Sequence, residues 1–268
     1  MDLYAVVGNP IAHSKSPSIH TYFAQNTQQD LHYSTLLGDE ERFEEQVTEF
    51  FKNGGKGLNV TMPFKGRAYD MCDVLSKRAK LAGAVNTLMM GRNGDIFGDT
   101  TDGVGMVNDI TKNHGQTLQG KRVLVIGAGG AVRGVLEPVL AENPASVTIV
   151  NRTVSKAEAL AEQYGCLASS FEALEGTFDV IINGSASSIS GSLPPLKDSI
   201  IDANTWCYDM AYSKERTLFL TWAEQHGAQG VDGLGMLVCQ AAESFYLWRQ
   251  VRPETSSLVT KMRQEMEA

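Results

Sequence analysis

The stretch that decides the fold is Lys121-Arg122-Val123-Leu124-Val125-Ile126-Gly127-Ala128-Gly129-Gly130-Ala131. Its first half is a short apolar run, which is typical of a buried strand in a parallel sheet. Three glycines within four residues follow, and a helical pattern runs from about Val132 to Leu140. A strand that enters a glycine-rich turn and then a helix is the opening unit of a Rossmann-type domain. In such a unit the helix N-terminus holds a pyrophosphate.

Strand and helix patterns alternate on both sides of this stretch. Short apolar runs predict strands, and apolar side chains at helical spacing predict helices. The predicted strands cover residues 3–8, 31–37, 57–60, 147–150, 178–182 and 206–210, and the predicted helices cover 18–26, 39–51, 155–164 and most of the chain after Met236, with a break at Pro253. Ser155 and Glu158 resemble a capping box at the start of one of these helices. The alternation predicts an α/β protein with mainly parallel sheets.

Length and composition narrow the class of the protein. The 268 residues suit one large domain or two smaller ones, and an apolar share of 43% excludes disorder as the main state. A net charge of −8 argues against nucleic-acid binding, and no apolar run is long enough to cross a membrane. The four cysteines form no C-x-x-C pair and the five histidines show no ligand spacing. We therefore expect a reduced, cytoplasmic protein without a metal.

The end of the strand after the glycine turn predicts the cofactor. An NAD site usually has Asp or Glu there, to accept a hydrogen bond from the ribose 2′-OH. This chain has Asn151-Arg152-Thr153, with Lys156 one turn on. Two cations without a carboxylate favour a 2′-phosphate and therefore NADP(H). The alternatives are that both cations are solvated surface charges and, because Val132 breaks the strict glycine pattern, that the turn is an ordinary strand–helix joint.

Polar groups in the first hundred residues are candidates for a substrate site. Asn59 and Thr61 lie on the same side of a strand end by two-residue alternation, and Lys65 follows Pro63, which stops the strand. Amide, hydroxyl and carboxylate groups recur in Val85-Asn86-Thr87 and in 99–103, and Ser14 and Ser16 stand at a helix start. Each has an ordinary alternative role as a turn residue, a surface charge or a helix cap, and the residues alone leave both interpretations open.

Several motifs, taken together, point to one family. They are Ser14-Lys15-Ser16-Pro17, Asn59-Val60-Thr61-Met62-Pro63-Phe64-Lys65, Gly83-Ala84-Val85-Asn86-Thr87, Gly98-Asp99-Thr100-Thr101-Asp102-Gly103, Gly127-Ala128-Gly129-Gly130-Ala131, Asn151-Arg152-Thr153, Tyr208-Asp209-Met210-Ala211-Tyr212 and residues 232–242. In this combination and order the chain closely resembles the shikimate dehydrogenase family, whose members interconvert 3-dehydroshikimate and shikimate with NADP.

The resemblance implies a role for each matching residue. It makes Lys65 and Asp102 the catalytic pair at the reacting C3 oxygen, one as acid–base and the other as its orienting partner, and the sequence does not decide which is which. The implied substrate-binding residues are Ser14, Ser16, Asn59, Thr61, Asn86, Tyr212 and Gln240. The implied cofactor-binding residues are Gly127, Ala128, Gly129, Gly130, Ala131, Asn151, Arg152, Thr153, Lys156, Met210 and Gly233.

The chain departs from the family pattern at two places. Where the family often shows N-A-T-S-S-G, this chain has Asn183-Gly184-Ser185-Ala186-Ser187-Ser188. The replacements stay small, so we expect cofactor binding to be kept, with an altered affinity. Lys156 stands where close relatives often have Arg, which weakens bidentate phosphate recognition and softens the preference for NADP over NAD.

The resemblance therefore implies an NADP-dependent oxidoreductase acting on a CH–OH group, which reversibly reduces 3-dehydroshikimate to shikimate in the pathway to chorismate and the aromatic amino acids. Two alternatives stay open: a quinate/shikimate dehydrogenase that prefers NAD, and a non-catalytic NADP-binding regulator on the same scaffold. We expect two α/β domains with the active site in the cleft between them. Residues 1–101 and 237–268 form the predicted substrate-binding domain and 102–236 the Rossmann-type NADP-binding domain. The expected partner is a small-molecule substrate, and the expected state is a monomer or homodimer.

Overall fold

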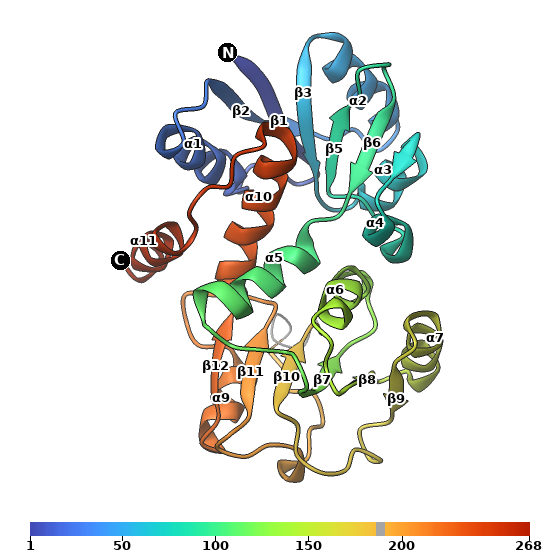
Figure 1. Ribbon diagram of the computed structural model, residues 1–268, viewed down its shortest axis with the longest axis vertical. Helices are drawn as coiled ribbons and strands as arrows, with labels where there is room; N and C mark the ends of the chain where they lie inside the picture. The colour runs from blue at the N-terminus through green and yellow to red at the C-terminus, as the bar shows by residue number, and fades with distance from the viewer. Residues whose placement is uncertain (186–190) are drawn as a thin grey trace. The chain divides into compact units, whose positions relative to one another are not determined.

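The computed structural model describes residues 1–185 and 191–268 of the chain. It divides into two compact units, each built from two separate stretches (Figure 1). Unit 1 comprises Met1–Gly105 and Val238–Leu258, and unit 2 comprises Met106–Leu237 and Val259–Ala268. Residues 186–188 of the segment that departs from the family pattern lie outside the described residues.

Unit 1 is built on a six-stranded sheet in the order β2-β1-β3-β5-β6-β4. The strands are β1 (Asp2–Gly8), β2 (Leu31–Leu37), β3 (Gly55–Val60), β4 (Val74–Leu75), β5 (Thr87–Met90) and β6 (Ile96–Asp99). β1 runs parallel to β2 and β3, as the sequence predicts, whereas β5 is antiparallel to both of its neighbours, β3 and β6. The hairpin of β5 and β6, between β3 and the edge strand β4, carries the chain from Asn86 to Asp102.

Helices cover both faces of this sheet. On one face, α2 (Phe43–Lys52), α3 (Lys65–Asp70) and α4 (Lys77–Ala82) bury an apolar cluster that includes Phe43, Leu58 and Leu88. On the other face lie α1 (Ser16–Asn26) and the last part of α10 (Leu234–Arg249). There Trp248 packs on Tyr4, and Gly57 leaves the room for it, because a Cβ at position 57 would lie 2.4 Å from the indole ring.

Unit 2 has the doubly wound sheet that the glycine-rich stretch predicts. Its six parallel strands have the order β12-β11-β10-β7-β8-β9 (Figure 1). They are β7 (Arg122–Ile126), β8 (Ser146–Val150), β9 (Leu167–Ser169), β10 (Val180–Asn183), β11 (Trp206–Asp209) and β12 (Gln229–Asp232). The chain adds strands in one direction from β7 and then reverses at β10. Ligands of such sheets bind at the carboxyl ends of the strands beside this reversal.

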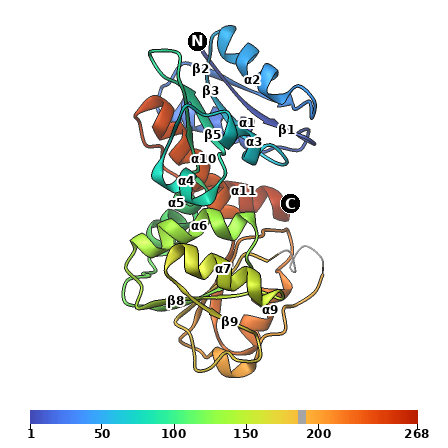
Figure 2. The ribbon, with the colours of Figure 1, turned by 90° about the vertical axis from the view of Figure 1, so that its right-hand side faces the viewer.

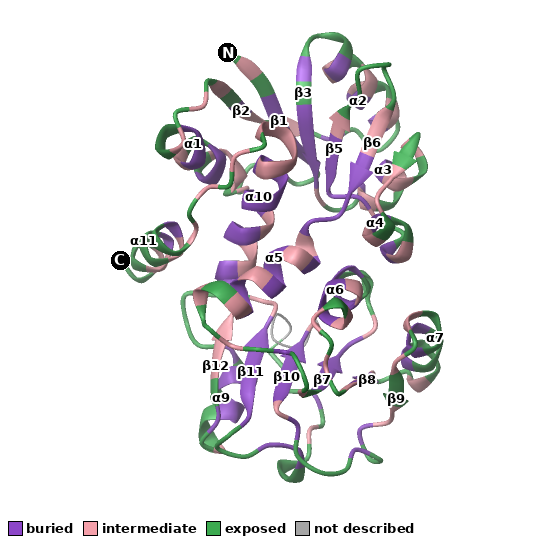
Figure 3. Ribbon diagram, viewed as in Figure 1, coloured by how far each residue is buried: buried purple, intermediate pink, exposed green. Residues whose placement is uncertain are grey.

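Two apolar clusters sandwich the sheet of unit 2, whose central strands are buried (Figure 3). One face is covered by the end of α5 (Asp102–Asn108), a following π-helical turn (Asp109–Asn113), α6 (Gly130–Ala141) and α7 (Val154–Tyr164). The other face is covered by α9 (Leu218–Gln225) and the segment around Phe171 and Phe178 (Figure 2). A 3-10 turn (Asp198–Ile200) precedes β11. This two-sided burial explains why β7 and β10 read as continuous apolar runs.

The last helix, α11 (Ser256–Glu267), differs from the sequence prediction. The prediction assigned the whole of 237–268 to the substrate-binding domain, whereas Val259–Ala268 belongs to unit 2. Polar contacts join this helix to unit 2: Arg263 of α11 pairs with Asp232 at the end of β12 and donates a hydrogen bond to the carbonyl oxygen of Ser213 at 3.0 Å.

Within 1–185 and 191–268, no helix is long and apolar enough to span a membrane. Over the same residues, no group of three or more His, Cys, Asp or Glu side chains is arranged to hold a metal ion.

Candidate active site

Lys65 and Asp102 form an ion pair in unit 1. The Nζ atom of Lys65 lies 2.6 Å from Oδ2 of Asp102, and both side chains are partly exposed. Lys65 is the first residue of α3, and Asp102 is the first residue of α5. The other oxygen of Asp102, Oδ1, accepts a hydrogen bond of 2.8 Å from Nδ2 of Asn86. Because each carboxylate oxygen has a donor, the orientation of Asp102 is fixed.

The backbone before α3 holds Lys65 in place. After β3 the chain turns through a cis Met62–Pro63 peptide bond. Phe64 then enters the core and stacks on Phe43, with ring centroids 4.6 Å apart. The carbonyl oxygen of Lys65 accepts a hydrogen bond of 2.9 Å from the N–H of Val85. The lysine therefore stands on an anchored helix start, and its side chain is free to reach Asp102.

Asn86 connects the segments around this pair. It is buried, and its Oδ1 accepts the backbone N–H of Thr101 at 2.9 Å. Its Nδ2 lies 3.0 Å from Oγ1 of Thr101 as well as 2.8 Å from Asp102. Its carbonyl oxygen accepts the N–H of Val60 at the end of β3. Asn86 thus fixes the spacing between β3 and the segment that carries Asp102.

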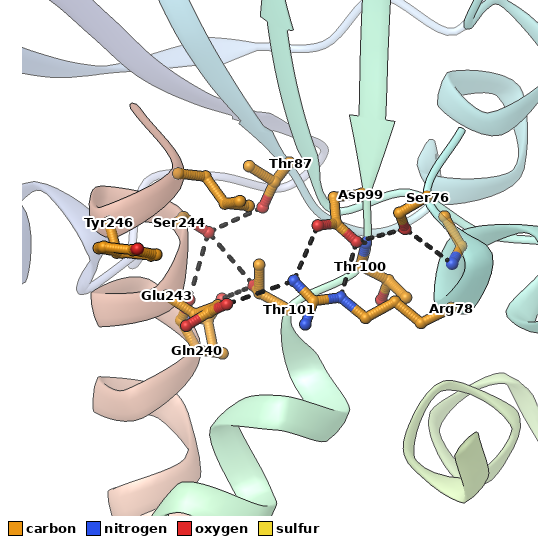
Figure 4. Close-up of polar contacts among 12 residues, drawn as sticks. Ser76, Arg78, Thr87, Asp99, Thr100, Thr101, Gln240, Glu243, Ser244 and Tyr246 are labelled. Atoms are coloured by element: carbon orange, nitrogen blue, oxygen red, sulfur yellow. Dashed lines mark hydrogen bonds and ion pairs between the residues drawn. The ribbon is translucent and has the colours of Figure 1, made fainter. Parts of the chain in front are cut away.

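Gln240 brings α10 to the same place. Its Oε1 lies 3.5 Å from Nδ2 of Asn86 and 3.5 Å from Oγ1 of Thr101. One turn later on α10, the hydroxyl of Ser244 lies 2.7 Å from Oγ1 of Thr87 and 3.2 Å from that of Thr101 (Figure 4). The structure therefore joins Lys65, Asn86, Asp102 and Gln240, which the sequence predicted as site residues, into one set of contacts in unit 1.

Asn59 belongs to the same set of contacts through its buried side chain. Its side chain is buried and makes hydrogen bonds to protein groups on four sides: it accepts from the hydroxyl of Tyr33 at 2.7 Å and lies within 3.2 Å of acceptors on Asn86, Thr87 and Ser244. A contact between Asn59 and substrate stays a prediction. Its contacts support a role in positioning Asn86.

Sequence reasoning named neither Tyr33, Thr101 nor Ser244 as site residues. The signal for Ser244 was present, because it follows Gln240 by four residues and therefore shares its helix face. Thr101 belongs to the motif Gly98-Asp99-Thr100-Thr101-Asp102-Gly103, but the motif does not indicate which of its hydroxyl groups contributes to the site. Tyr33 carried no signal, because aromatic residues in a strand usually belong to the core.

The predicted hydroxyl ligands lie in the same unit. The N–H of Ser16, the first residue of α1, is 3.3 Å from Oγ of Ser14, and both serines are partly exposed. Burial raises the pKa of Tyr33 well above its usual value, and a hydrogen bond with Ser16 opposes this in part. Thr61, also partly exposed, follows β3 and donates its N–H to Val7.

The glycine turn of unit 2 forms an open cradle. Gly127 is buried with φ +111, and a Cβ there would lie 3.2 Å from the backbone of Gly184. Gly129 caps α6 without a side-chain hydrogen bond, and a Cβ on Gly129 or Gly130 would meet nothing within 4 Å. The first N–H groups of a helix have no partner within it. The turn from Gly127 through Ala128 to Ala131 therefore fits a pyrophosphate at the N-terminus of α6.

Two cations follow β8. Arg152 and Lys156 are exposed, and neither forms an ion pair with another of the described residues. Nδ2 of Asn151 donates to the carbonyl oxygen of Thr153 at 3.0 Å, which closes the turn between them. Exposed cations beside a closed turn fit the 2′-phosphate of NADP(H).

The remaining predicted residues lie at the carboxyl ends of β11 and β12. The N–H of Met210 donates to Asn183 at 2.9 Å, which places Met210 beside the end of β10. Gly233 packs against that methionine, since a Cβ at 233 would lie 2.3 Å from its carbonyl oxygen. Tyr212 belongs to unit 2 and is exposed, with a pKa raised by partial burial and by Asp232.

A doubly wound sheet with a glycine turn, joined in one chain to a unit with a lysine–carboxylate pair, is typical of nicotinamide-dependent oxidoreductases. Three family models match this chain: the shikimate dehydrogenase substrate binding domain at residues 6–88, shikimate / quinate 5-dehydrogenase at 109–190 and the shikimate 5′-dehydrogenase C-terminal domain at 233–267. The chain belongs to the shikimate dehydrogenase family.

Individual relatives agree with this assignment. The shikimate dehydrogenase (NADP(+)) of Hahella chejuensis is 54% identical over 98% of this chain and 99% of its own. The crystal structure of an Ael1 enzyme from Pseudomonas putida matches with a TM-score of 0.94 and 44% identity, over 97% of this chain and 98% of that one. The shikimate 5-dehydrogenase of Thermus thermophilus, solved in complex with NADP(H) and shikimate, matches with a TM-score of 0.88 and 30% identity, over 98% of this chain and 99% of that one.

Proposed function

We propose that this chain catalyses the reversible NADPH-dependent reduction of 3-dehydroshikimate to shikimate. The observation that carries the proposal is the contact set of Lys65, Asp102 and Asn86, because it supplies a cation on a fixed carboxylate beside amide and hydroxyl groups. The family and the names of the relatives support the same reaction. Unit 1 is the proposed substrate-binding part and unit 2 the proposed NADP-binding part.

The residues of unit 1 account for the proton transfer. An ammonium group has three donors. One of those on Lys65 serves Asp102, which leaves others for the C3 oxygen of the substrate. As negative charge grows on this oxygen, the ammonium stabilises it and donates a proton. Asp102 holds the lysine in the required direction. In shikimate oxidation the neutral amine of Lys65 would accept the proton of the C3 hydroxyl and become an ammonium again.

The other predicted residues supply recognition. Ser14, Ser16, Thr61 and Gln240 offer hydroxyl and amide groups to the hydroxyls and carboxylate of shikimate. In unit 2, the N–H groups at the start of α6 would hold the pyrophosphate, and Arg152 and Lys156 the 2′-phosphate. The bound cofactor supplies the hydride.

Substituting the lysine tests this proposal. We expect Lys65→Ala to lower kcat by about 10²- to 10⁴-fold, the usual contribution of a general acid–base group, with a smaller change in the KM for shikimate. Initial rates of NADP+ reduction at 340 nm measure both constants. Lys80→Ala, which removes an exposed lysine of α4, is the matched control. An unchanged kcat in Lys65→Ala would remove Lys65 from the mechanism.

Cofactor and substrate choice are tested on the same assay. We expect kcat/KM to favour NADP+ over NAD+ and shikimate over quinate. Arg152→Ala should lower kcat/KM for NADP+ by about 10- to 100-fold, since a hydrogen bond to a charged group contributes about 1.5–3 kcal/mol, and should leave the value for NAD+ nearly unchanged. A preference for NAD+ in the unmodified protein would favour the quinate/shikimate alternative, and no turnover at all would favour a binding protein.

The proposal also covers the cellular compartment and the oligomeric state. The four cysteines are thiols rather than disulfides, which supports a reducing compartment such as the cytoplasm. We expect a monomer or homodimer, and sedimentation velocity of the purified chain would measure its mass.

A further inference from the structure

A buried cluster of charges lies beside the candidate active site in unit 1. Arg78 of α4 extends between two carboxylates, Asp99 at the end of β6 and Glu243 of α10 (Figure 4). The side chains are 18%, 5% and 8% exposed, respectively. Arg252 closes the cluster from the exposed side, with Nη1 at 2.7 Å from Oε2 of Glu243. We call these four residues the Arg78 cluster.

Arg78 grips Asp99 with two parallel hydrogen bonds. Its Nε lies 2.8 Å from Oδ1 and its Nη2 lies 2.7 Å from Oδ2. The same Nη2 lies 3.4 Å from Oε1 of Glu243. Burial opposes the charge on Arg78, but Asp99 and then Glu243 outweigh it and raise the pKa of the guanidinium. Arg78 therefore stays charged and bridges both carboxylates.

Stability is a weak reason for such a cluster. Taking charges out of water costs several kcal/mol per ion, and apolar replacements for a buried ion pair are often neutral or stabilising. A buried guanidinium does, however, impose a geometry, because its planar fork fits a carboxylate in one orientation. The question is which geometry this cluster fixes.

On the β6 side, the cluster fixes the segment that leads to Asp102. Oδ1 of Asp99 accepts the N–H of Thr100 at 2.7 Å and the hydroxyl of Ser76 at 2.5 Å. The carbonyl oxygen of Asp99 accepts the N–H of Asn86 at 3.0 Å. Asp99 thus anchors both Asn86 and the start of the segment 100–102.

On the α10 side, the cluster fixes the helix that carries Gln240. Glu243 and Gln240 are three residues apart, so they are neighbours on the helix surface. Gln240 lies 3.5 Å from both Asn86 and Thr101, a distance at which a small shift of α10 breaks the contact. The bridge from Asp99 to Glu243 therefore sets the spacing between the two elements that carry Asp102 and Gln240.

We propose that Arg78 is a positioning residue: by holding the Asp99 and Glu243 carboxylates together, it keeps Asp102 and Gln240 in one arrangement for the substrate. This inference rests on the proposed function. The proposal does not require Arg78 to contact substrate, since its hydrogen bonds go to Asp99 and Glu243. Its effect passes through Asp99 to Asn86 and the segment 100–102, and through Glu243 to Gln240.

The discriminating variant is Arg78→Lys. A lysine keeps the charge but serves as a point charge, so it cannot grip Asp99 with a fork and reach Glu243 at the same time. We expect at least a tenfold rise in the KM for shikimate or fall in kcat, while the KM for NADP+ stays within about twofold. Glu243→Gln should show the same pattern more weakly. Its effect should not add to that of Arg78→Lys, because both break one bridge.

Arg249→Lys is the matched control. Arg249 lies on α10, the helix that also carries Glu243. Its side chain is 18% exposed, like that of Arg78, and it forms an ion pair with Asp2 at the start of β1. Its hydrogen bonds go to Asp2, Tyr4 and Gln29, none of which is a candidate site residue. We expect Arg249→Lys to leave the kinetic constants for shikimate within about twofold. Circular dichroism and thermal unfolding of each variant establish that it folds.

The outcomes separate this inference from the proposed function. Turnover of the unmodified protein tests the function alone. If it is active, equal effects of Arg78→Lys and Arg249→Lys, or unchanged constants in Arg78→Lys, overturn the positioning role. If Arg78→Lys does not fold, Glu243→Gln gives the same decision. If the unmodified protein binds shikimate in calorimetry without turnover, the Kd replaces KM in the comparison. An unmodified protein that neither binds nor oxidises shikimate overturns both proposals.

Discussion

At the scale of single residues, His20 is a titratable side chain buried in the core of unit 1. It is 1% exposed, and neither ring nitrogen has a hydrogen-bond partner that meets normal geometry among the described residues. The ring stacks on Tyr33 with centroids 4.2 Å apart. Burial lowers its pKa from 6.5 to about 3, although Asn59 opposes this in part. His20 is therefore neutral in the folded protein at pH values where an unfolded histidine is charged.

This neutral histidine makes the protein sensitive to acid. Between pH 6.5 and about 3 the unfolded state binds a proton that the folded state does not, so the free energy of unfolding falls as the pH falls through this window. We expect His20→Phe, which keeps a stacked ring, to reduce the loss between pH 7.5 and 5.5 by about 1 kcal/mol. Urea unfolding at both pH values measures this. His32→Asn, which removes an exposed histidine, is the matched control. An identical loss in His20→Phe would show that His20 titrates normally.

The same residues show what a sequence can predict at this scale. Lys65, Asn86, Asp102 and Gln240 were identifiable because motifs with fixed spacing carry them, and the structure brings them into contact. For Asn59, strand alternation and a family motif both indicated the site, but neither shows whether its side chain meets substrate or a buried hydroxyl. The Arg78 cluster had no sequence signal, because its members are joined only by the fold.

At the scale of elements, two departures from the usual sequence patterns compensate each other, one in the glycine turn before α6 and one in the segment after β10. Val132, where a small residue is usual, is buried in α6. A Cβ on Gly184 would lie 2.5 Å from Cγ2 of Val132 and 2.8 Å from Sδ of Met210. Gly184 stands where the family often shows alanine. The missing methyl group after β10 therefore makes room for the larger side chain on α6.

Restoring the alanine tests this compensation. We expect Gly184→Ala to lower the free energy of unfolding by about 1–3 kcal/mol, as overpacking does, because the β-branched Val132 has little rotamer freedom in a helix. Adding Val132→Ala should recover most of this loss, measured by chemical denaturation. Gly134→Ala is the control on α6, since a Cβ there meets nothing within 4 Å. Simple additivity of the two substitutions would argue against the compensation.

The elements that the sequence predicted well are long and strongly patterned. β2 was predicted with its observed bounds, and the strands β1, β7 and β8 differ by a residue at one end. β4, β5, β6, β9 and β12 escaped prediction because each has only two to four residues, too few to show a strand pattern. The predicted capping box was wrong: α7 begins at Val154, and its N-cap, Thr153, makes no side-chain hydrogen bond. A displacement of the N-cap by two residues, from Ser155 to Thr153, removes the motif.

At the scale of the whole molecule, each compact unit is assembled from two distant stretches of chain. The candidate substrate residues before position 105 and Gln240 fall in unit 1, and the glycine turn with Arg152 and Lys156 falls in unit 2. The motifs predicted this discontinuity, since their order along the chain separates Gln240 from its partners. They could not predict that the end of α11 belongs to unit 2, because the contacts that hold it there, such as the ion pair of Arg263 with Asp232, are formed only in the folded chain.

This division predicts that each ligand protects its own unit. We expect NADP+ alone to slow amide hydrogen exchange at 127–131 and 151–156, and shikimate alone to slow it around Ser16, Lys65, Asn86 and Gln240. Binding to the folded state alone stabilises it by RT ln(1 + [L]/Kd), about 2.7 kcal/mol at 100 times Kd, so amides that exchange through unfolding of that unit should slow about 100-fold. Arg152→Ala should reduce the protection by NADP+ at a fixed concentration and leave the protection by shikimate unchanged. Protection of the glycine turn by shikimate alone would contradict the assignment of substrate to unit 1.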